Sequence, residues 1–208
     1  MVSITNRRSV MTLFSGQLDP YSHQVRFALA EKKGVPVEII EVDPDTRMED
    51  LLDLNPYNSL PTLVERDLVL YHPDIILEFL DERFPHPPLL PVYPVARANS
   101  RMITHRMKHD WYTLYEIIVG DDPIAAVQAR KQLTESLIST SSLFGKKSFF
   151  MNDEFSLIDC YVAPLLWRLS SLDIQLPESA EMIYDYSERI FKRPAFKSSL
   201  TELERELR

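Results

Sequence analysis

The first 84 residues alternate between strand-like and helix-like hydrophobic patterns. Val10–Phe14 is a β-favouring run, and the polar residues 15–17 that follow it are typical of a loop. In order, we expect a strand at 10–14, a helix from Ser22 to a glycine stop at Gly34, a strand at 37–42, a short helix at 49–54, a hairpin formed by 62–65 and 68–70, and a helix over 75–84. This order predicts a small α/β domain over residues 8–84, in which the first crossover joins parallel strands.

The next segment is rich in proline. Five prolines fall within it: Pro85, Pro87, Pro88, Pro91 and Pro94. Because proline lacks the N–H that a helix interior or a central strand needs, we expect residues 85–94 to form a stiff linker. Beyond the linker the periodicity is only helical, over residues 95–119, 124–143, 156–169 and 182–191. The sequence therefore predicts an all-helical second domain over residues 95–208.

The composition argues against several classes of function. A net charge of -8 opposes the electrostatic attraction that drives most nucleic-acid binding, so we expect no direct contact with DNA or RNA. The single cysteine, Cys160, excludes an intramolecular disulfide and a Cys-x-x-Cys site. No apolar run is long enough to span a membrane, and Met1–Arg8 lacks the apolar core of a signal peptide. We expect a cytoplasmic protein that, if it acts in gene expression, does so by contacting another protein.

Two local motifs indicate a known fold. Asn55-Pro56-x-x-x-Leu60-Pro61-Thr62-Leu63-Val64 resembles the thioredoxin-fold segment in which the proline before the third strand is cis, so Pro61 is the candidate for a cis bond. Ser156-Leu157-Ile158-Asp159 resembles the helix-capping box of glutathione transferases, in which the Ser156 hydroxyl and the Asp159 carboxylate satisfy N–H groups reciprocally. We therefore give Ser156 and Asp159 structural roles. The resemblance implies a thioredoxin-like α/β N-terminal domain followed by an all-α C-terminal domain.

A closer resemblance covers residues 8–208. The segments 81–97, 110–112 and 156–168 are similar to those of the stringent starvation protein A family. This resemblance implies a homodimer that associates with RNA polymerase holoenzyme, regulates transcription in stress and starvation, and uses its Pro-His-Pro surface to contact the sigma factor.

In this chain the corresponding surface is formed by Pro85, His86 and Pro87, together with Tyr93. A stiff, extended backbone would present His86 and Tyr93 to a partner with little loss of conformational entropy. The alternative interpretation of the same residues is a rigid spacer between domains, in which His86 is merely solvated.

The residues that a thiol-dependent enzyme needs are altered at the start of the first helix. Relatives that use a thiol carry Cys-Pro-Tyr-Cys where this chain has Asp19-Pro20-Tyr21-Ser22. Asp19 cannot attack a disulfide and would repel a thiolate. Ser22 or Tyr21 could still donate a hydrogen bond to a thiolate, so a glutathione-dependent transferase or thiol reductase remains the alternative function.

The second glutathione-binding feature is also altered. Glutathione-binding relatives open the third helix with a Glu-Ser or Gln-Ser pair, whereas the matching residues here are His72-Pro73. Proline is a good helix starter but offers neither the hydroxyl nor the N–H that would hold the γ-glutamyl carboxylate. We therefore predict no catalytic residue and no cofactor.

Other reactive side chains have simpler interpretations. His105 and His109 lie one helical turn apart near Asp110, but no third ligand has a motif, so a polar helix face is favoured over a metal site. Cys160 is expected to be a buried packing residue. The charged C-terminal stretch 202–208 is expected to be a solvated helix end.

Overall fold

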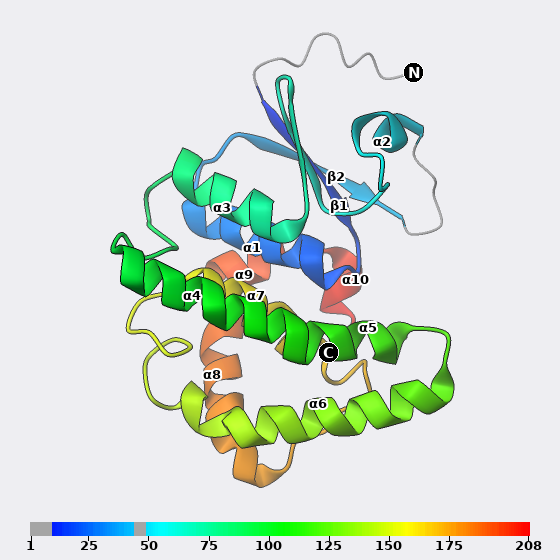
Figure 1. Ribbon diagram of the computed structural model, residues 1–208, viewed down its shortest axis with the longest axis vertical. Helices are drawn as coiled ribbons and strands as arrows, with labels where there is room; N and C mark the ends of the chain where they lie inside the picture. Colours follow the sequence, from blue (N-terminus) through cyan, green and yellow to red (C-terminus); the bar gives the residue numbers. More distant parts are fainter. Residues whose placement is uncertain (1–9, 44–48) are drawn as a thin grey trace. The chain divides into compact units, whose positions relative to one another are not determined.

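The computed structural model describes residues 10–43 and 49–208, and they form two compact units (Figure 1). The N-terminal unit, here called unit 1, runs to Pro87 and also contains Ser198–Glu204. Unit 2 comprises Pro88–Lys197 and Arg205–Arg208. The expected start of the first domain at residue 8, and the segment Met1–Arg8 in which we expect no signal peptide, lie outside the described residues.

Unit 1 is built on a four-stranded mixed sheet. Its strands are β1 (Met11–Gly16), β2 (Val37–Val42), β3 (Thr62–Glu65) and β4 (Leu68–Tyr71), in the spatial order β2-β1-β3-β4. β1 pairs with β2 in parallel and with β3 antiparallel, while β3 and β4 form an antiparallel hairpin. The sequence predicts these four strands and the parallel first crossover.

Helices cover both faces of this sheet. On one face α2 (Glu49–Leu54) places Leu51 against Phe14 and Val42. Leu13 points the other way because side chains alternate along a strand, and it is fully buried. α1 (Pro20–Lys32) and α3 (Pro73–Arg83) pack against each other and against the strands (Figure 1).

Unit 2 is all helical. Its helices are α4 (Pro94–Met107), α5 (Thr113–Val119), α6 (Pro123–Phe144), α7 (Leu157–Arg168) and α8 (Glu181–Phe191). A short helix that the periodicity does not predict follows, α9 (Pro194–Ser199), and α10 (Glu202–Arg205), which lies mostly in unit 1, forms the expected C-terminal helix end. α7 has 11 of its 12 residues buried, and both α4 and α8 pack against it. Among the described residues, no helix combines the length and the apolar character needed to cross a membrane.

The single long helix expected over residues 95–119 contains a π-helical turn. Lys108–Tyr112 adopts this wider winding between α4 and α5. The turn allows two consecutive aromatic residues to be buried, with Trp111 4% and Tyr112 1% exposed. The Trp111 indole donates to Ser136 Oγ at 2.9 Å, and the Tyr112 hydroxyl donates to the Tyr161 carbonyl at 2.7 Å.

The expected capping box is present at the start of α7, and Asp159 does more than cap that helix. The Ser156 N–H donates to Asp159 Oδ2 at 2.9 Å, which is the reciprocal bond of the box. Asp159 Oδ1 also accepts from the Phe150 N–H at 2.9 Å and from the Tyr186 hydroxyl at 2.8 Å. Asp159 is 0% exposed, so one buried carboxylate ties together the start of α7, the loop before it and α8.

The C-terminal stretch is not the solvated end that its charges suggest. Glu204 is 0% exposed, and its Oε2 accepts from Arg26 Nη2 of α1 at 2.6 Å and from the Thr201 N–H at 3.0 Å. The Arg26 Nε donates to the Ser199 carbonyl at 2.8 Å. The expectation that residues 202–208 are solvated is therefore wrong for Glu204, because a buried arginine on α1 needs an anionic partner. Residues 198–204 consequently lie in unit 1, although the periodicity predicts one helical domain over residues 95–208.

The Asp159 network generates a stability prediction. In Asp159→Asn, one of the two oxygen positions becomes an NH2 group that faces a donor, so at least one buried donor loses its acceptor. We expect a loss of about 1–3 kcal/mol in the free energy of unfolding. Urea denaturation of the variant measures this loss, and Asp121→Asn at an exposed position is the matched control. A loss no larger than that of the control would contradict the structural role of Asp159.

The same variant should show a characteristic pH dependence. Burial raises the pKa of Asp159 above its ordinary value of 3.8, although the hydrogen bonds that it accepts act in the opposite direction. A raised pKa in the folded state means that this group stabilises the fold below the unfolded-state pKa, and that its contribution is lost as pH rises through the folded-state pKa. The difference in stability between wild type and Asp159→Asn should therefore be larger at about pH 4 than at neutral pH. A difference that shrinks on acidification would contradict the direction of the shift.

Candidate functional site

The N-terminus of α1 is the place where a thiol-dependent relative would hold its thiolate, and here it holds a carboxylate. Asp19 is the N-cap of α1: Oδ1 accepts from the Tyr21 N–H at 3.1 Å and Oδ2 from the Ser22 N–H at 2.8 Å. A Cβ atom added to Gly16 would lie 2.7 Å from the Asp19 Cβ, so the end of β1 closes tightly on this residue. The positive end of the helix is already neutralised by a fixed anion.

The hydroxyl of Ser22 is also engaged. Ser22 is 0% exposed; its Oγ donates to Asp19 Oδ2 at 2.6 Å and accepts from the Gly16 N–H at 2.9 Å. Because a hydroxyl has one proton, Ser22 cannot donate to a thiolate without breaking its bond to Asp19. Tyr21 is partly exposed, and its N–H is bound by Asp19.

The segment before β3 has the geometry that the sequence predicts. The Leu60–Pro61 peptide bond is cis. Asn55, which is 0% exposed, donates through Nδ2 to Thr62 Oγ1 at 2.9 Å and to the Ser59 carbonyl at 3.1 Å. The Asn55 side chain thus holds the loop that carries Pro61 against the first residue of β3.

The start of α3 is poorly suited to an anionic ligand. His72 precedes the helix with φ 86°, Pro73 occupies the first helical position without an N–H, and Asp74 adds a carboxylate to the first turn. Pro73 is buried, and His72 is exposed with its Nδ1 3.9 Å from Asp74 Oδ2. A substrate carboxylate at this helix end would meet one donor fewer and one negative charge more than at an unsubstituted helix start.

The expected partner-binding residues of unit 1 form an exposed segment whose backbone is held from inside the protein. Pro85, His86 and Pro87 are all exposed, and the His86–Pro87 bond is cis. Lys32, at the end of α1, donates through Nζ to the Pro87 carbonyl at 2.7 Å and pairs with Asp81 Oδ1 at 2.5 Å.

This lysine is completely buried, and Asp81 is 6% exposed. The charge of Lys32 is therefore compensated inside the unit, while one of its three donors fixes the carbonyl of the segment. A buried lysine at the end of a helix is also favoured by the helix dipole.

The fourth expected partner-binding residue lies in unit 2. Tyr93 is the residue before α4 and is 79% exposed. Its neighbours Val92 and Val95 are 78% and 76% exposed, whereas Leu89 and Leu90 are buried in the same unit. This short stretch therefore combines a buried anchor with three exposed apolar side chains.

The remaining candidates do not form a site. Arg106 and Asp110 form a pair at 3.7 Å, and the neighbouring His105 and His109 are exposed. No group of three potential metal-ligating side chains occurs in the described part of the chain. Cys160 is fully buried, as expected for a packing residue.

Two important residues escape sequence reasoning. Arg26 and Lys32 are charged residues on a helix with an apolar periodicity, and a buried lysine or arginine has the same one-letter signature as a solvated one. One signal in the sequence does indicate that these two side chains are buried. Apolar side chains surround the helix and leave it no polar face, at Val25, Phe27, Ala28 and Leu29.

Comparison with known proteins gives the same architecture. Residues 20–83 match the family model for the N-terminal domain of glutathione S-transferase, and residues 103–194 match the model for its C-terminal domain. A rice glutathione transferase solved in complex with glutathione superposes with a TM-score of 0.83 at 21% identity, covering 96% of this chain and 94% of that one. A Tau class enzyme from mango gives a TM-score of 0.80 at 24% identity and covers 96% of both chains. The predicted fold class is confirmed.

Curated relatives are more similar in sequence. A stringent starvation protein A homolog from Coxiella burnetii is 54% identical and covers 97% of both chains. Homologs of the same name from Pasteurella multocida and Haemophilus influenzae are 52% and 48% identical, covering 96% and 97% of this chain and 94% and 95% of theirs. Since these identities extend over almost the full length of each protein, the chain belongs to the stringent starvation protein A family of the glutathione transferase superfamily.

Proposed function

We propose that this chain is a cytoplasmic transcription regulator of the stress and starvation response, without enzymatic activity. It binds RNA polymerase holoenzyme as a homodimer and contacts the sigma factor through Pro85, His86, Pro87 and Tyr93. The names of its relatives support a role in starvation, and the family resemblance supports polymerase as the partner.

The observation that carries the proposal is the supported, exposed segment at Pro85–Pro87. A surface that already holds its bound shape loses little conformational entropy on association. The bond from the buried Lys32 to the Pro87 carbonyl keeps the backbone in place, while the His86 ring faces solvent. Tyrosine is among the residues enriched at the centre of protein interfaces, which supports Tyr93 as an anchor of this surface.

The absence of transferase activity is supported by the chemistry at α1. Activating a thiol requires a positive environment that lowers the thiol pKa. Here the Asp19 carboxylate occupies the helix N-terminus and engages the Ser22 hydroxyl. A glutathione thiolate placed there would face a negative charge instead of a free helix end.

The surface proposal predicts the effect of two side-chain truncations. His86→Ala and Tyr93→Ala should each weaken capture of RNA polymerase holoenzyme about tenfold or more, because each removes an exposed anchor and leaves the backbone bonds in place. His109→Ala and Tyr57→Ala are matched controls, since His109 is exposed and Tyr57 is 73% exposed. Binding constants from biolayer interferometry, with melting temperatures alongside, check the result. Equal losses in the controls and in the test variants would contradict the assignment.

The role of the buried lysine can be tested separately from these side chains. Lys32→Met combined with Asp81→Leu removes both buried charges together, which is generally tolerated by a folded core. Without the bond to Pro87, the segment must be ordered on binding at about 1–2 kcal/mol per residue, so polymerase affinity should fall roughly tenfold. The exposed pair Lys131 and Glu135, both changed to Gln, is the control. Unchanged affinity in a double variant that folds normally would show that the segment needs no internal support.

The proposed lack of transferase activity predicts how the protein responds to glutathione. Wild type should show no saturable binding by calorimetry, whereas Asp19→Asn combined with Pro73→Ser should bind more tightly. The variant removes the fixed charge and restores a hydroxyl and an N–H at α3. Micromolar binding by wild type would contradict a non-enzymatic function and revive the transferase that uses Ser22 or Tyr21.

A further inference from the structure

Arg208 of unit 2 holds its guanidinium in an unusual setting. The guanidinium lies over the Trp167 ring at 5.2 Å and over the Phe191 ring at 4.8 Å from each centroid. The planes of these two rings are nearly perpendicular and their centroids lie 4.9 Å apart, so the guanidinium contacts both rings at once. Within the described part of the chain, the five N–H donors of this guanidinium have no hydrogen-bond acceptor and no anionic partner.

Arg208 is an exposed residue, so its guanidinium is accessible to an anion, although contact with the two rings removes part of its solvent. This partial loss of solvent lowers the pKa of Arg208 below its ordinary value, and only a weaker interaction with Tyr184 opposes the shift. A cation that has lost part of its water without gaining a counter-ion is a preorganised anion receptor. An arginine fork of this kind matches the geometry of a carboxylate with two parallel hydrogen bonds.

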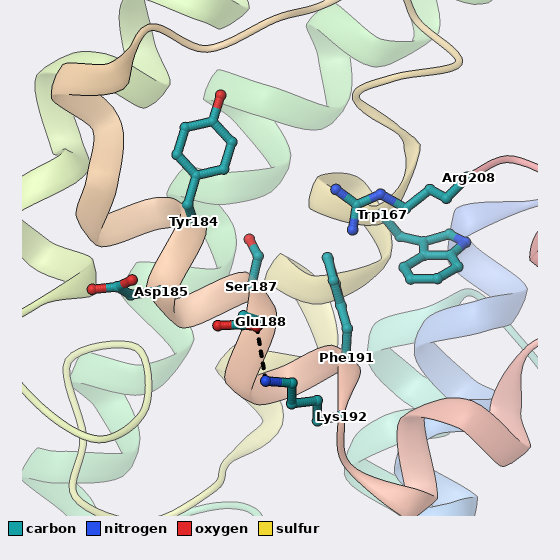
Figure 2. A pocket seen from close by; sticks show the side chains of 8 residues that line it. All are labelled: Trp167, Tyr184, Asp185, Ser187, Glu188, Phe191, Lys192 and Arg208. Carbon is teal, nitrogen blue, oxygen red and sulfur yellow. Dashed lines mark hydrogen bonds and ion pairs between the residues drawn. The ribbon is translucent and has the colours of Figure 1, made fainter.

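A cavity of about 540 Å³ opens beside this cation. Its wall contains Trp167, Arg208 and, from α8, Tyr184, Ser187 and Phe191. Figure 2 shows Ser187 and Phe191 directed from α8 towards the side where Trp167 and Arg208 lie, whereas Asp185 points to the opposite side of the helix. The volume lies within the range of small-molecule sites, which is about 300–1,000 Å³.

The remaining charges of the wall limit the charge that a ligand can carry. Glu188 is paired with Lys192 at 2.8 Å, so the opposite charges of these two side chains largely offset each other (Figure 2). Asp185 adds an uncompensated negative charge at the margin of the cavity. Among these lining residues Arg208 is the cation without an ion pair, so it favours a ligand with a single negative charge, and Asp185 would repel the second charge of a dianion such as phosphate. The aromatic part of the wall requires an apolar body on the ligand.

We propose that this cavity binds a small organic monoanion, with its carboxylate on the Arg208 guanidinium and a planar apolar body against Tyr184 and Phe191. This proposal does not rest on the function proposed above. The site gives the helical unit a place at which a metabolite carrying an aromatic carboxylate could be bound.

The test uses 3-phenylpropanoate as the probe and follows the Trp167 indole resonance by ¹H–¹⁵N NMR. The protein has two tryptophans, so Trp111→Phe assigns the Trp167 signal, and the Trp111 signal of the other variants reports that unit 2 is folded. We expect a saturable shift of the Trp167 signal with a Kd on the order of 1 mM for a ligand of this size. The uncharged analogue 3-phenylpropanamide should bind at least tenfold more weakly, because it cannot accept two charge-assisted bonds.

Two variants locate the site. Arg208→Gln should weaken binding of the carboxylate about tenfold or more, and Arg106→Gln, which removes the same charge from an exposed position on α4, should leave it unchanged. Equal binding of the amide and the acid, or equal binding by Arg208→Gln and wild type, would overturn the proposal. So would an equally strong shift with inorganic phosphate, or no saturable shift at all.

Discussion

The structure depends on the burial of α1 on almost all sides. Eleven of its 13 residues are buried, and charged residues are among them. An unpaired buried charge costs several kcal/mol, so each charged side chain requires a partner from another part of the chain. Arg26 obtains Glu204 from the C-terminal segment, and Lys32 obtains Asp81 from α3. This constraint explains why residues 198–204 return to unit 1 and why the proline-rich segment is held at the Pro87 carbonyl.

The same helix links architecture to function. Its N-terminus is the place where the superfamily does thiol chemistry, and in this chain Asp19 closes that end with its own carboxylate. Its C-terminus supports the exposed segment that we propose as a recognition surface. A helix that holds a catalytic thiolate in other members of the fold can therefore serve as a structural support once a carboxylate replaces the thiol. The π-helical turn and the Asp159 network play the equivalent role in unit 2, because each fixes buried polar groups that would otherwise lack partners.

Much of the fold can be predicted from the sequence, because hydrophobic periodicity, turn residues and helix-capping residues determine structure through neighbours in the sequence. The strand at 37–42, the helix at 49–54, the cis bond at Pro61 and the Ser156 cap are all local signals. The sequence does not predict that residues 198–204 return to unit 1, because the ion pair between Arg26 and Glu204 joins residues that are far apart in the sequence. The support of Pro87 by Lys32 is missed for the same reason. For the candidate site, the sequence predicts the loss of thiol chemistry at Asp19 and the loss of donors for a substrate carboxylate at Pro73. It does not predict the hydrogen bond from the Ser22 hydroxyl to Asp19.

We propose that the proline-rich segment, and not the α1 N-terminus, carries the function of this protein. The most direct test is photo-crosslinking from an unnatural amino acid at position 92, which is 78% exposed, with position 124, which is 83% exposed, as the control. Both proteins are incubated with RNA polymerase holoenzyme and irradiated, and the crosslinked subunit is identified by mass spectrometry. We expect a crosslink to the sigma factor from position 92 and none from position 124. Crosslinking from position 124 alone, or from neither position while the complex still forms, would contradict this proposal.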